Sequence, residues 1–345
     1  MLVAKLVALR RLELFEEDMP RPGPGEVLLR VDAVGICRSD VHNFAAGHIG
    51  GVRVPFPFVL GHETAGIVVA HGDGVNEPPT GARVAVEPGI NCGRCEWCLR
   101  GDPNLCADLR FHGSPPVEGT LRQYIVHLAR LCIPLDAALG IDDGVMLEPL
   151  AIGVHAVRLA HLAPGMSVAV IGTGPVGLMM LAVAAASGAT RIIAADLLPH
   201  RLALATRYGA TETIEAGRQD AAAEVARLTD GRGVDVAFEA TTSPAAPGQA
   251  AHVVAPGGTV VVAGITEAQE VAIDAHVARR KGLTFRWVRR SKLAVEPAMA
   301  LAASGRVPLG GLVTHRFRLG SAQEAFELVE AYGDGVFKAV VEPNR

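Results

Sequence analysis

Residues 35–44, GICRSDVHNF, place a thiol, a hydroxyl and an imidazole close together in Cys37, Ser39 and His42. Such a group could be a nucleophile with its base, a metal ligand beside a proton relay, or an ordinary polar turn. The segment alone leaves these three interpretations open, so the rest of the chain must decide between them.

Four of the six cysteines fall within residues 92–106, in the pattern Cys92-x₂-Cys95-x₂-Cys98-x₇-Cys106. An iron–sulfur run of the bacterial type expects its fourth cysteine three residues on, and a redox pair expects a thioredoxin-like setting. A nucleic-acid zinc module expects basic surroundings, whereas the charges of this loop are mixed in sign. The pattern therefore predicts a closed, structural zinc site, and Cys132 in LARLCIPL is predicted to be a buried core residue.

Three further ligand candidates stand in two other segments: His62 and Glu63 in LGHETAG, and Glu148 in LEPLAIG. A catalytic zinc takes three protein ligands and keeps one position open, a requirement that Cys37 together with an imidazole and a carboxylate satisfies. Taken singly, His62 suits a turn and Glu148 suits a helix N-terminus.

A glycine turn, Gly172-Thr-Gly174-Pro175-Val176-Gly177, follows an apolar strand and precedes an apolar helix. This placement favours a pyrophosphate at a helix N-terminus. Asp196 ends the next strand, where a carboxylate accepts from a ribose hydroxyl and repels a 2′-phosphate. The pattern predicts NAD rather than NADP, with Arg201 over the adenosine end.

Composition excludes several classes of protein. A net charge of −4 gives no footprint for nucleic acid or anionic membrane. Residues 168–190 form an uncharged run, but the glycine turn inside it favours a buried strand and helix over a membrane span. The N-terminus shows no signal-peptide pattern, so with the clustered thiols we expect a cytoplasmic protein.

Short strands bounded by turn residues fill the first 150 residues, and apolar strands alternate with helices after them. We predict an α/β protein with a discontinuous β-rich domain, 1–150 and 286–345, and an inserted doubly wound domain, 151–285. Residues 283–287 are predicted to be the last strand of the parallel sheet. A capping box, Ser321 with Glu324, is predicted to open a helix, and FKAVVE is predicted to close the chain as a strand.

Together GICRSDVH, GHETAG, the four-cysteine run, EPL and GTGPVG resemble the zinc-dependent medium-chain alcohol dehydrogenase family, in its order and over almost the whole chain. Residues 111–124, EPL and FRW are similar to its polyol branch, the sorbitol and xylitol dehydrogenases. The resemblance implies a GroES-like catalytic domain, a Rossmann domain, NAD, one catalytic and one structural zinc, and a homodimer or homotetramer.

The resemblance also assigns roles to individual residues. Cys37, His62 and Glu63 would bind the catalytic zinc, with Glu148 on its water or in the shell itself. Ser39, or water held by Glu148, would pass the alcohol proton towards His42, and Asp40 would support the ligand histidine. The residues expected to contact the cofactor are Gly264, Ile265, Phe285 and Arg286. Those expected to contact the substrate are Asn43, Phe44, Phe111, Arg286 and Trp287.

Three residues depart from the polyol pattern, Arg38, Asn43 and Trp287, so another alcohol of the same family is the nearest alternative: a butanediol, threonine, aldose or sugar phosphate. Arg38, Arg286, Arg289 and Arg290 are the residues that would favour a phosphorylated substrate. An alternative of another class is a zinc- and nucleotide-binding protein without catalysis, whose sequence would have lost its ligands or relay.

Overall fold

The computed structural model describes residues 1–345, which form two compact units. The first contains Met1–Glu148 and Val295–Arg345, and the second contains Pro149–Ala294. The chain thus returns to the first unit at Val295 rather than at residue 286. The reason is that strand β17, Thr284–Trp287, still pairs with the sheet of the second unit.

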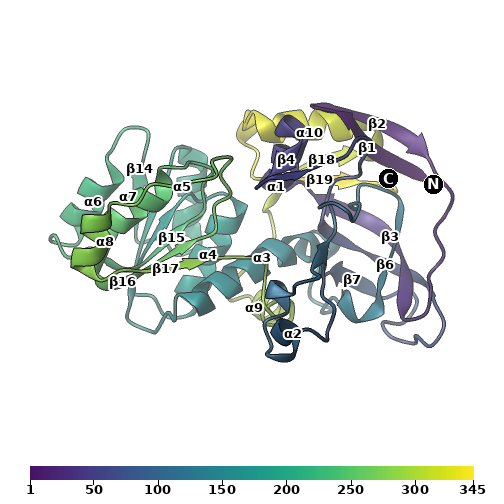
Figure 1. The fold of residues 1–345 in the computed structure, drawn as a ribbon, viewed down its shortest axis with the longest axis horizontal. Helices are drawn as coiled ribbons and strands as arrows, with labels where there is room; N and C mark the ends of the chain where they lie inside the picture. Colours follow the sequence, from purple (N-terminus) through teal and green to yellow (C-terminus); the bar gives the residue numbers. More distant parts are fainter. The chain divides into compact units, whose positions relative to one another are not determined.

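The first unit is built on a seven-stranded sheet with the order β11-β7-β6-β3-β19-β18, in which β10 also pairs with β3 (Figure 1). Its strands are β3 Glu26–Gly35, β6 Glu63–His71, β7 Arg83–Val86, β10 Tyr124–Leu128, β11 Cys132–Pro134, β18 Val313–Arg318 and β19 Lys338–Glu342. Three two-stranded pairs accompany it: β1 Leu2–Ala8 with β2 Arg11–Glu16, β4 His48–Ile49 with β5 Val52–Arg53, and β8 Gly89–Ile90 with β9 Arg110–Phe111. The predicted closing strand is confirmed as β19.

Strand β3 is central because it pairs with β6, β10 and β19. Val27, Leu29 and Val31 are fully buried on one face, as the two-residue period of a strand requires. They pack into one core with residues of the neighbouring strands and of helices α1, Arg38–Ala46, and α10, Ala322–Glu330. Strand β3 ends at Gly35, two residues before Cys37, so the core fixes the chain at the start of the Cys37 segment.

The other helices of the first unit are short. They are α2 Glu96–Leu99, α9 Val295–Ala303 and the 3₁₀ turns η1 Pro103–Leu105, η2 Ala129–Leu131, η3 Leu319–Ser321 and η4 Gly333–Gly335. The predicted capping box at α10 is wrong. Ser321 belongs to the turn η3, and its side chain makes no capping hydrogen bond.

Helix α3, Ile141–Leu159, crosses the division between the units, with Glu148 and Pro149 in its interior. Glu148 is therefore not at a helix N-terminus, the structural role that its sequence suggests when taken singly. A proline in this position removes one backbone hydrogen bond of the helix.

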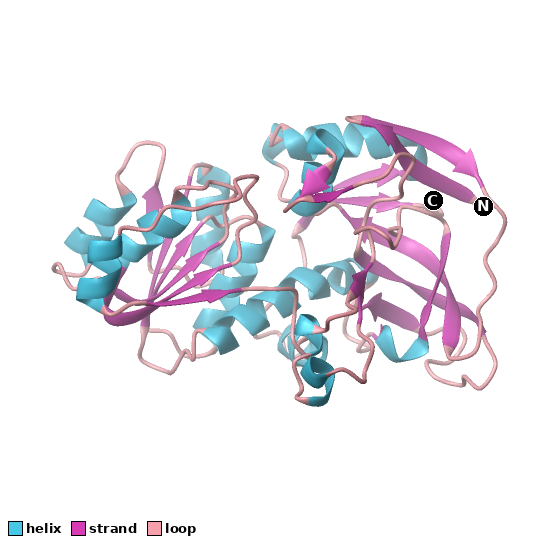
Figure 2. Cartoon of the chain, in the orientation of Figure 1, coloured by secondary structure: helices cyan, strands magenta, loops and turns pink.

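The second unit is a six-stranded parallel sheet with the order β14-β13-β12-β15-β16-β17, the arrangement of a doubly wound dinucleotide fold. Its helices cover both faces of the sheet (Figure 2). Its elements are β12 Ser167–Ile171, α4 Pro175–Ala186, β13 Arg191–Asp196, α5 Pro199–Arg207, β14 Glu212–Glu215, α6 Ala221–Leu228, β15 Val234–Glu239, α7 Ala246–Val253, β16 Val254–Val262, α8 Ala275–Lys281 and β17.

The uncharged run at 168–190 is strand β12, the glycine turn and helix α4, as predicted. Strands buried on both faces and a helix packed against them account for its apolar character. None of the helices has both the length and the apolar character that crossing a membrane requires.

Candidate metal centres and cofactor site

Asp40 connects the segment around Cys37 to the segment around His62. Cys37 is the N-cap of α1 and Asp40 lies in its first turn, 1% exposed. The Asp40 carboxylate accepts from the backbone N–H of Cys37 at 3.3 Å and of Gly61 at 3.1 Å, and it lies 3.3 Å from Nδ1 of His62. An imidazole held through Nδ1 presents Nε2 to a ligand, so this contact is the one that the predicted supporting role of Asp40 requires.

Glu63 is placed by the pairing of β6 with β3, which sets it opposite Gly35. A Cβ on Gly35 would lie 2.2 Å from Oε2 of Glu63, so only glycine leaves room for this carboxylate. Oε2 accepts a hydrogen bond from Nζ of Lys338 at 2.5 Å, and both side chains are 1% exposed.

Cys37, His62 and Glu63 converge: one ligand atom from each lies within 4.8 Å of the others. Burial alone would lower the pKa of His62, but the charges of Asp40 and Cys37 outweigh it and raise that pKa well above its ordinary value. The same negative field would stabilise a divalent cation. Oε1 of Glu63 is buried without a hydrogen-bond partner, so the residues present fit a metal ion.

Glu148 is not one of these three converging residues. Its charge nevertheless acts on the same cluster, because it is one of the groups that raise the pKa of Lys338. Burial would lower that pKa, whereas Glu63 and Cys37 raise it more strongly and Glu148 adds to them. No role of Lys338 was predicted from the sequence, although a lysine inside the apolar strand FKAVVE was a visible signal.

The residues after His42 differ from their predicted roles. Phe44 is fully buried, and its ring centroid lies 5.2 Å from that of Phe326 in the core. Phe44 is therefore a packing residue, and its predicted substrate contact is corrected. Asn43 is 5% exposed, and its carbonyl accepts the N–H of Gly47 at the end of α1.

Arg38 also has a structural role. Its guanidinium donates to the carbonyls of Val329 and Glu330 at the end of α10, and it lies 4.5 Å from the ring centroid of Tyr332. A cation at a helix C-terminus is stabilising, so Arg38 needs no phosphorylated substrate to explain it. Phe111, in contrast, lies beside the ligand set, its ring centroid 5.3 Å from that of His62.

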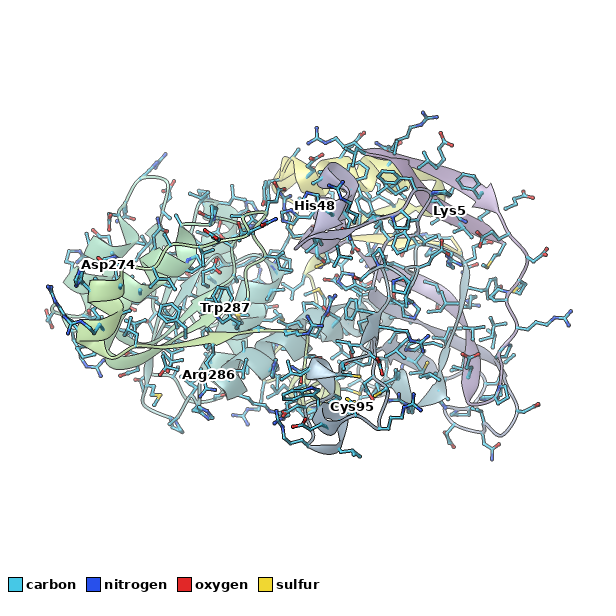
Figure 3. All side chains as sticks on the ribbon, viewed as in Figure 1. Lys5, His48, Cys95, Asp274, Arg286 and Trp287 are labelled. Atoms are coloured by element: carbon cyan, nitrogen blue, oxygen red, sulfur yellow. The ribbon has the colours of Figure 1, made fainter.

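The four clustered cysteines form a second centre in the first unit, where Figure 3 labels Cys95. Their Sγ atoms are 3.6 Å apart for Cys95 and Cys98 and 3.9 Å apart for Cys95 and Cys106, far longer than a disulfide bond. Backbone N–H groups lower the pKa of Cys95 to about 6, whereas desolvation and the adjacent thiols raise that of Cys98 to about 12. Four thiols so close cannot all ionise without a cation among them, and the set fits a closed tetrahedral zinc site.

Cys132 is buried in the core, as predicted, and burial raises its pKa to about 12. Such a thiol is protonated at neutral pH and is an inert packing residue.

The turn at 172–177 in the second unit requires glycine at its first and last positions. Gly172 has a φ of 88°, and a Cβ on Gly177 would lie 1.8 Å from the Gly172 carbonyl oxygen. Gly174 caps the N-terminus of α4, where Pro175 and Val176 form the first turn. Helix and strand can therefore pack closely and present backbone N–H groups to an anion.

Asp196 braces this turn. One carboxylate oxygen accepts the N–H of Thr173 at 2.7 Å and its hydroxyl at 3.2 Å, and the other accepts the N–H of Leu198 at 2.9 Å. Arg201 lies 3.9 Å from the same carboxylate. Asp196 therefore positions the glycine turn, a role not predicted from the sequence, and its contact with a ribose stays a prediction.

Gly264 follows strand β16 beside the buried Glu239. A Cβ on Gly264 would lie 2.5 Å from Oε2 of Glu239, whose carboxylate also accepts the N–H and hydroxyl of Thr241. Ile265 is 42% exposed at this end of the sheet. Glu239 was not predicted from the sequence, and its carboxylate lies against the loops that follow β15 and β16.

Strand β17 contains Phe285, Arg286 and Trp287, of which Trp287 is 55% exposed. Figure 3 labels Arg286 and Trp287 on this strand. Because successive side chains of a strand point to opposite faces, we expect only one of these two to meet a ligand lying on one side of the sheet. The predicted substrate contacts of Arg286 and Trp287 stay predictions.

Comparison with known proteins identifies the family. Residues 23–137 match the alcohol dehydrogenase GroES-like domain, and residues 175–304 match the zinc-binding dehydrogenase family. Sorbitol dehydrogenase from Bacillus subtilis is 39% identical, over 96% of this chain and 95% of that protein. A probable D-xylulose reductase A from Neosartorya fischeri is 40% identical, over 93% and 91%.

Among solved structures, an oxidoreductase of unknown specificity from Escherichia coli superposes with a TM-score of 0.94 at 34% identity, covering 99% of this chain and 98% of that one. The chain therefore belongs to the zinc-dependent medium-chain alcohol dehydrogenase family. It is an NAD-dependent oxidoreductase with zinc as its metal cofactor.

Proposed function

We propose that this chain oxidises a secondary alcohol of a polyol, of the sorbitol or xylitol kind, to the corresponding ketose with NAD. The identity to a sorbitol dehydrogenase and a xylulose reductase over nearly the whole chain supports this substrate class. The observation that carries the chemistry is the convergence of Cys37, His62 and Glu63, which supplies three ligands of different type and leaves a fourth position for substrate.

Zinc in this set would polarise the alcohol oxygen, and NAD would accept the hydride. Cys37, His62 and Glu63 are the proposed direct ligands, with Glu148 outside the set and able to hold a water. Ser39 or that water would accept the alcohol proton and pass it to His42 on α1. The Asp40 carboxylate fixes the orientation of His62 and stabilises its contact with a cation.

The proposed contacts beyond the metal follow from the two units taken separately. In the second unit the glycine turn would take the pyrophosphate, Asp196 and Arg201 the adenosine ribose, and Gly264 to Ile265 with Phe285 or Arg286 the rest of the cofactor. In the first unit Phe111, beside His62, is the best supported substrate contact. Cys92, Cys95, Cys98 and Cys106 would hold a structural zinc.

We also propose that the protein works in the cytoplasm as a homodimer or homotetramer. All six cysteines are free in the structure, which suits a reducing compartment.

The test is the formation of NADH, followed at 340 nm, with a panel of polyols, butanediol, threonine, aldoses and sugar phosphates. We expect the highest kcat/KM with a polyol and about two zinc ions per chain, one for each type of site. Cys37→Ser should abolish turnover while leaving one zinc bound. No turnover of any polyol would overturn the proposed substrate class, and turnover by metal-free Cys37→Ser would overturn the zinc mechanism.

A further inference from the structure

Lys338 is a buried cation beside the candidate metal ligands. It begins strand β19 and is 1% exposed, which is rare for lysine unless the ammonium group is paired. Its Nζ donates to Oε2 of Glu63 at 2.5 Å and lies 3.4 Å from the carbonyl oxygen of Ile36. The ammonium group is therefore held at a defined place by an acid and a backbone acceptor.

The two carboxylate oxygens of Glu63 consequently differ. Oε2 is engaged by Lys338, whereas Oε1 is buried without a hydrogen-bond partner. Leaving a buried acceptor unpaired is costly, and a charged oxygen more so, unless a cation meets it. Because Glu63 belongs to the converging set with Cys37 and His62, Oε1 is the oxygen left for that cation.

We propose that Lys338 is a positioning residue of the catalytic metal centre: by holding Oε2, it restricts Glu63 to a single ligand oxygen, Oε1. This inference rests on the proposed function only in taking the ion to be zinc. A carboxylate free to give both oxygens would occupy the position that a catalytic site must keep open. The lysine also balances charge, because the buried carboxylates of Glu63 and Asp40 and the thiol of Cys37 gather negative charge around this site.

The first experiment is Lys338→Met in the full chain with cobalt(II) replacing zinc. Four-coordinate cobalt absorbs visible light more strongly than five-coordinate cobalt, so release of Oε2 should weaken the visible band. The four-cysteine site contributes equally to both spectra. We expect kcat to fall about 10- to 100-fold with a smaller change in KM, and Lys338→Arg to restore both spectrum and kcat.

A matched control is Lys281→Met in the second unit. Lys281 donates to the carbonyls of Ala251, His252 and Val254 at the end of α7, so its loss should lower stability without altering the cobalt spectrum. An unchanged spectrum and unchanged kcat in Lys338→Met would overturn the proposal.

A second experiment needs no substrate and keeps Lys338 in place. In Glu63→Gln the lysine requires an acceptor, so the amide oxygen should turn to Nζ and the amide NH₂, which cannot bind a metal, should face Cys37 and His62. We expect Glu63→Gln to bind about one metal ion per chain, and Glu63→Gln with Lys338→Met to regain part of the second. If Glu63→Gln keeps both ions, Lys338 does not dictate the orientation. Both metal readouts stand even if no polyol is oxidised, which separates this proposal from the proposed function.

Discussion

A single carboxylate, that of Asp40, connects the ligand residues that the sequence separates. It contacts the backbone at Cys37 and at Gly61 and the ring of His62, so one charge fixes two chain segments and one imidazole. Partners of this kind raise the basicity of a ligand histidine and hold its ring in place.

Replacing Asp40 by asparagine should therefore damage the metal centre more than the fold. The amide keeps one acceptor but loses the charge that stabilises a cation at His62, and we expect catalytic zinc affinity to fall about 10- to 100-fold. Competition with a chelator measures this. Asp235→Asn is the control, since Asp235 accepts from Ser167 in the second unit and should leave zinc affinity unchanged. Equal effects of the two variants would contradict the assigned role.

At the same scale, residue type predicted chemistry better than it predicted orientation. The structure brings Cys37, His62 and Glu63 together and gathers the four clustered thiols. Both groups could be predicted because few residue types bind metals and their spacing in the sequence is informative. Phe44 and Arg38 lie in the same segment as Cys37, yet neither has the predicted role. Phe44 is a core residue, and the Arg38 side chain binds the carbonyl groups at the end of α10. Which face of α1 is buried depends on Phe326 and Val329, nearly 300 residues away along the chain, and no local pattern contains that information.

At the scale of elements, the register of β3 against β6 decides the geometry of the metal centre. Gly35 stands opposite Glu63, and the space that a side chain would need there is filled by the Glu63 carboxylate and by Val145 of α3. A shift of one residue in this pairing would move Glu63 to the other face of the sheet.

Gly35→Ala should consequently displace Glu63. The new Cβ would lie 2.2 Å from Oε2 of Glu63 and 2.7 Å from Cγ1 of Val145, so we expect the variant to lose catalytic zinc and about 1–3 kcal/mol in the free energy of unfolding. Denaturant unfolding and metal counting check the two effects. Gly310→Ala is the matched control, because a Cβ there meets nothing within 4 Å. Full zinc occupancy in Gly35→Ala would show that Glu63 tolerates the displacement.

The order of the elements could be predicted where the sequence contains distinct apolar runs. Parallel strands buried on both faces are continuous apolar runs, so β12, β13, β15 and β16 were visible in the sequence. The end of the second unit was harder to predict, because β17 is short and largely exposed. The loop that follows β17 also has no composition that distinguishes it from the segments around it. The other end of that unit was predicted within two residues, at 151 against Pro149, although helix α3 continues across it.

At the scale of the whole molecule, the second unit contains the glycine turn, Asp196 and Glu239 at one end of a parallel sheet, where such folds bind dinucleotides. Binding to the folded state alone stabilises it in proportion to the logarithm of ligand concentration.

NAD should therefore raise the melting temperature of the protein, with about 2.7 kcal/mol of stabilisation at one hundred times its dissociation constant. NADP at the same concentration should raise it less, because Asp196 would face the 2′-phosphate. Asp196→Asn keeps an acceptor for Thr173 and should narrow the difference between the cofactors. A thermal melt with each cofactor decides it, and an equal shift with NAD and NADP in the unchanged protein would rule out discrimination by Asp196.

The sequence by itself determined the chemistry of this protein: two groups of metal ligands, a glycine turn for a dinucleotide, and the fold class that places them. These follow from residue type and short-range spacing, which are properties of the chain. Only the tertiary structure decided which carboxylate meets the ligands, that Lys338 lies against Glu63, and that Phe44 is core. Each of these depends on contacts between strands and helices that are far apart in the sequence. No local pattern in the sequence specifies such contacts.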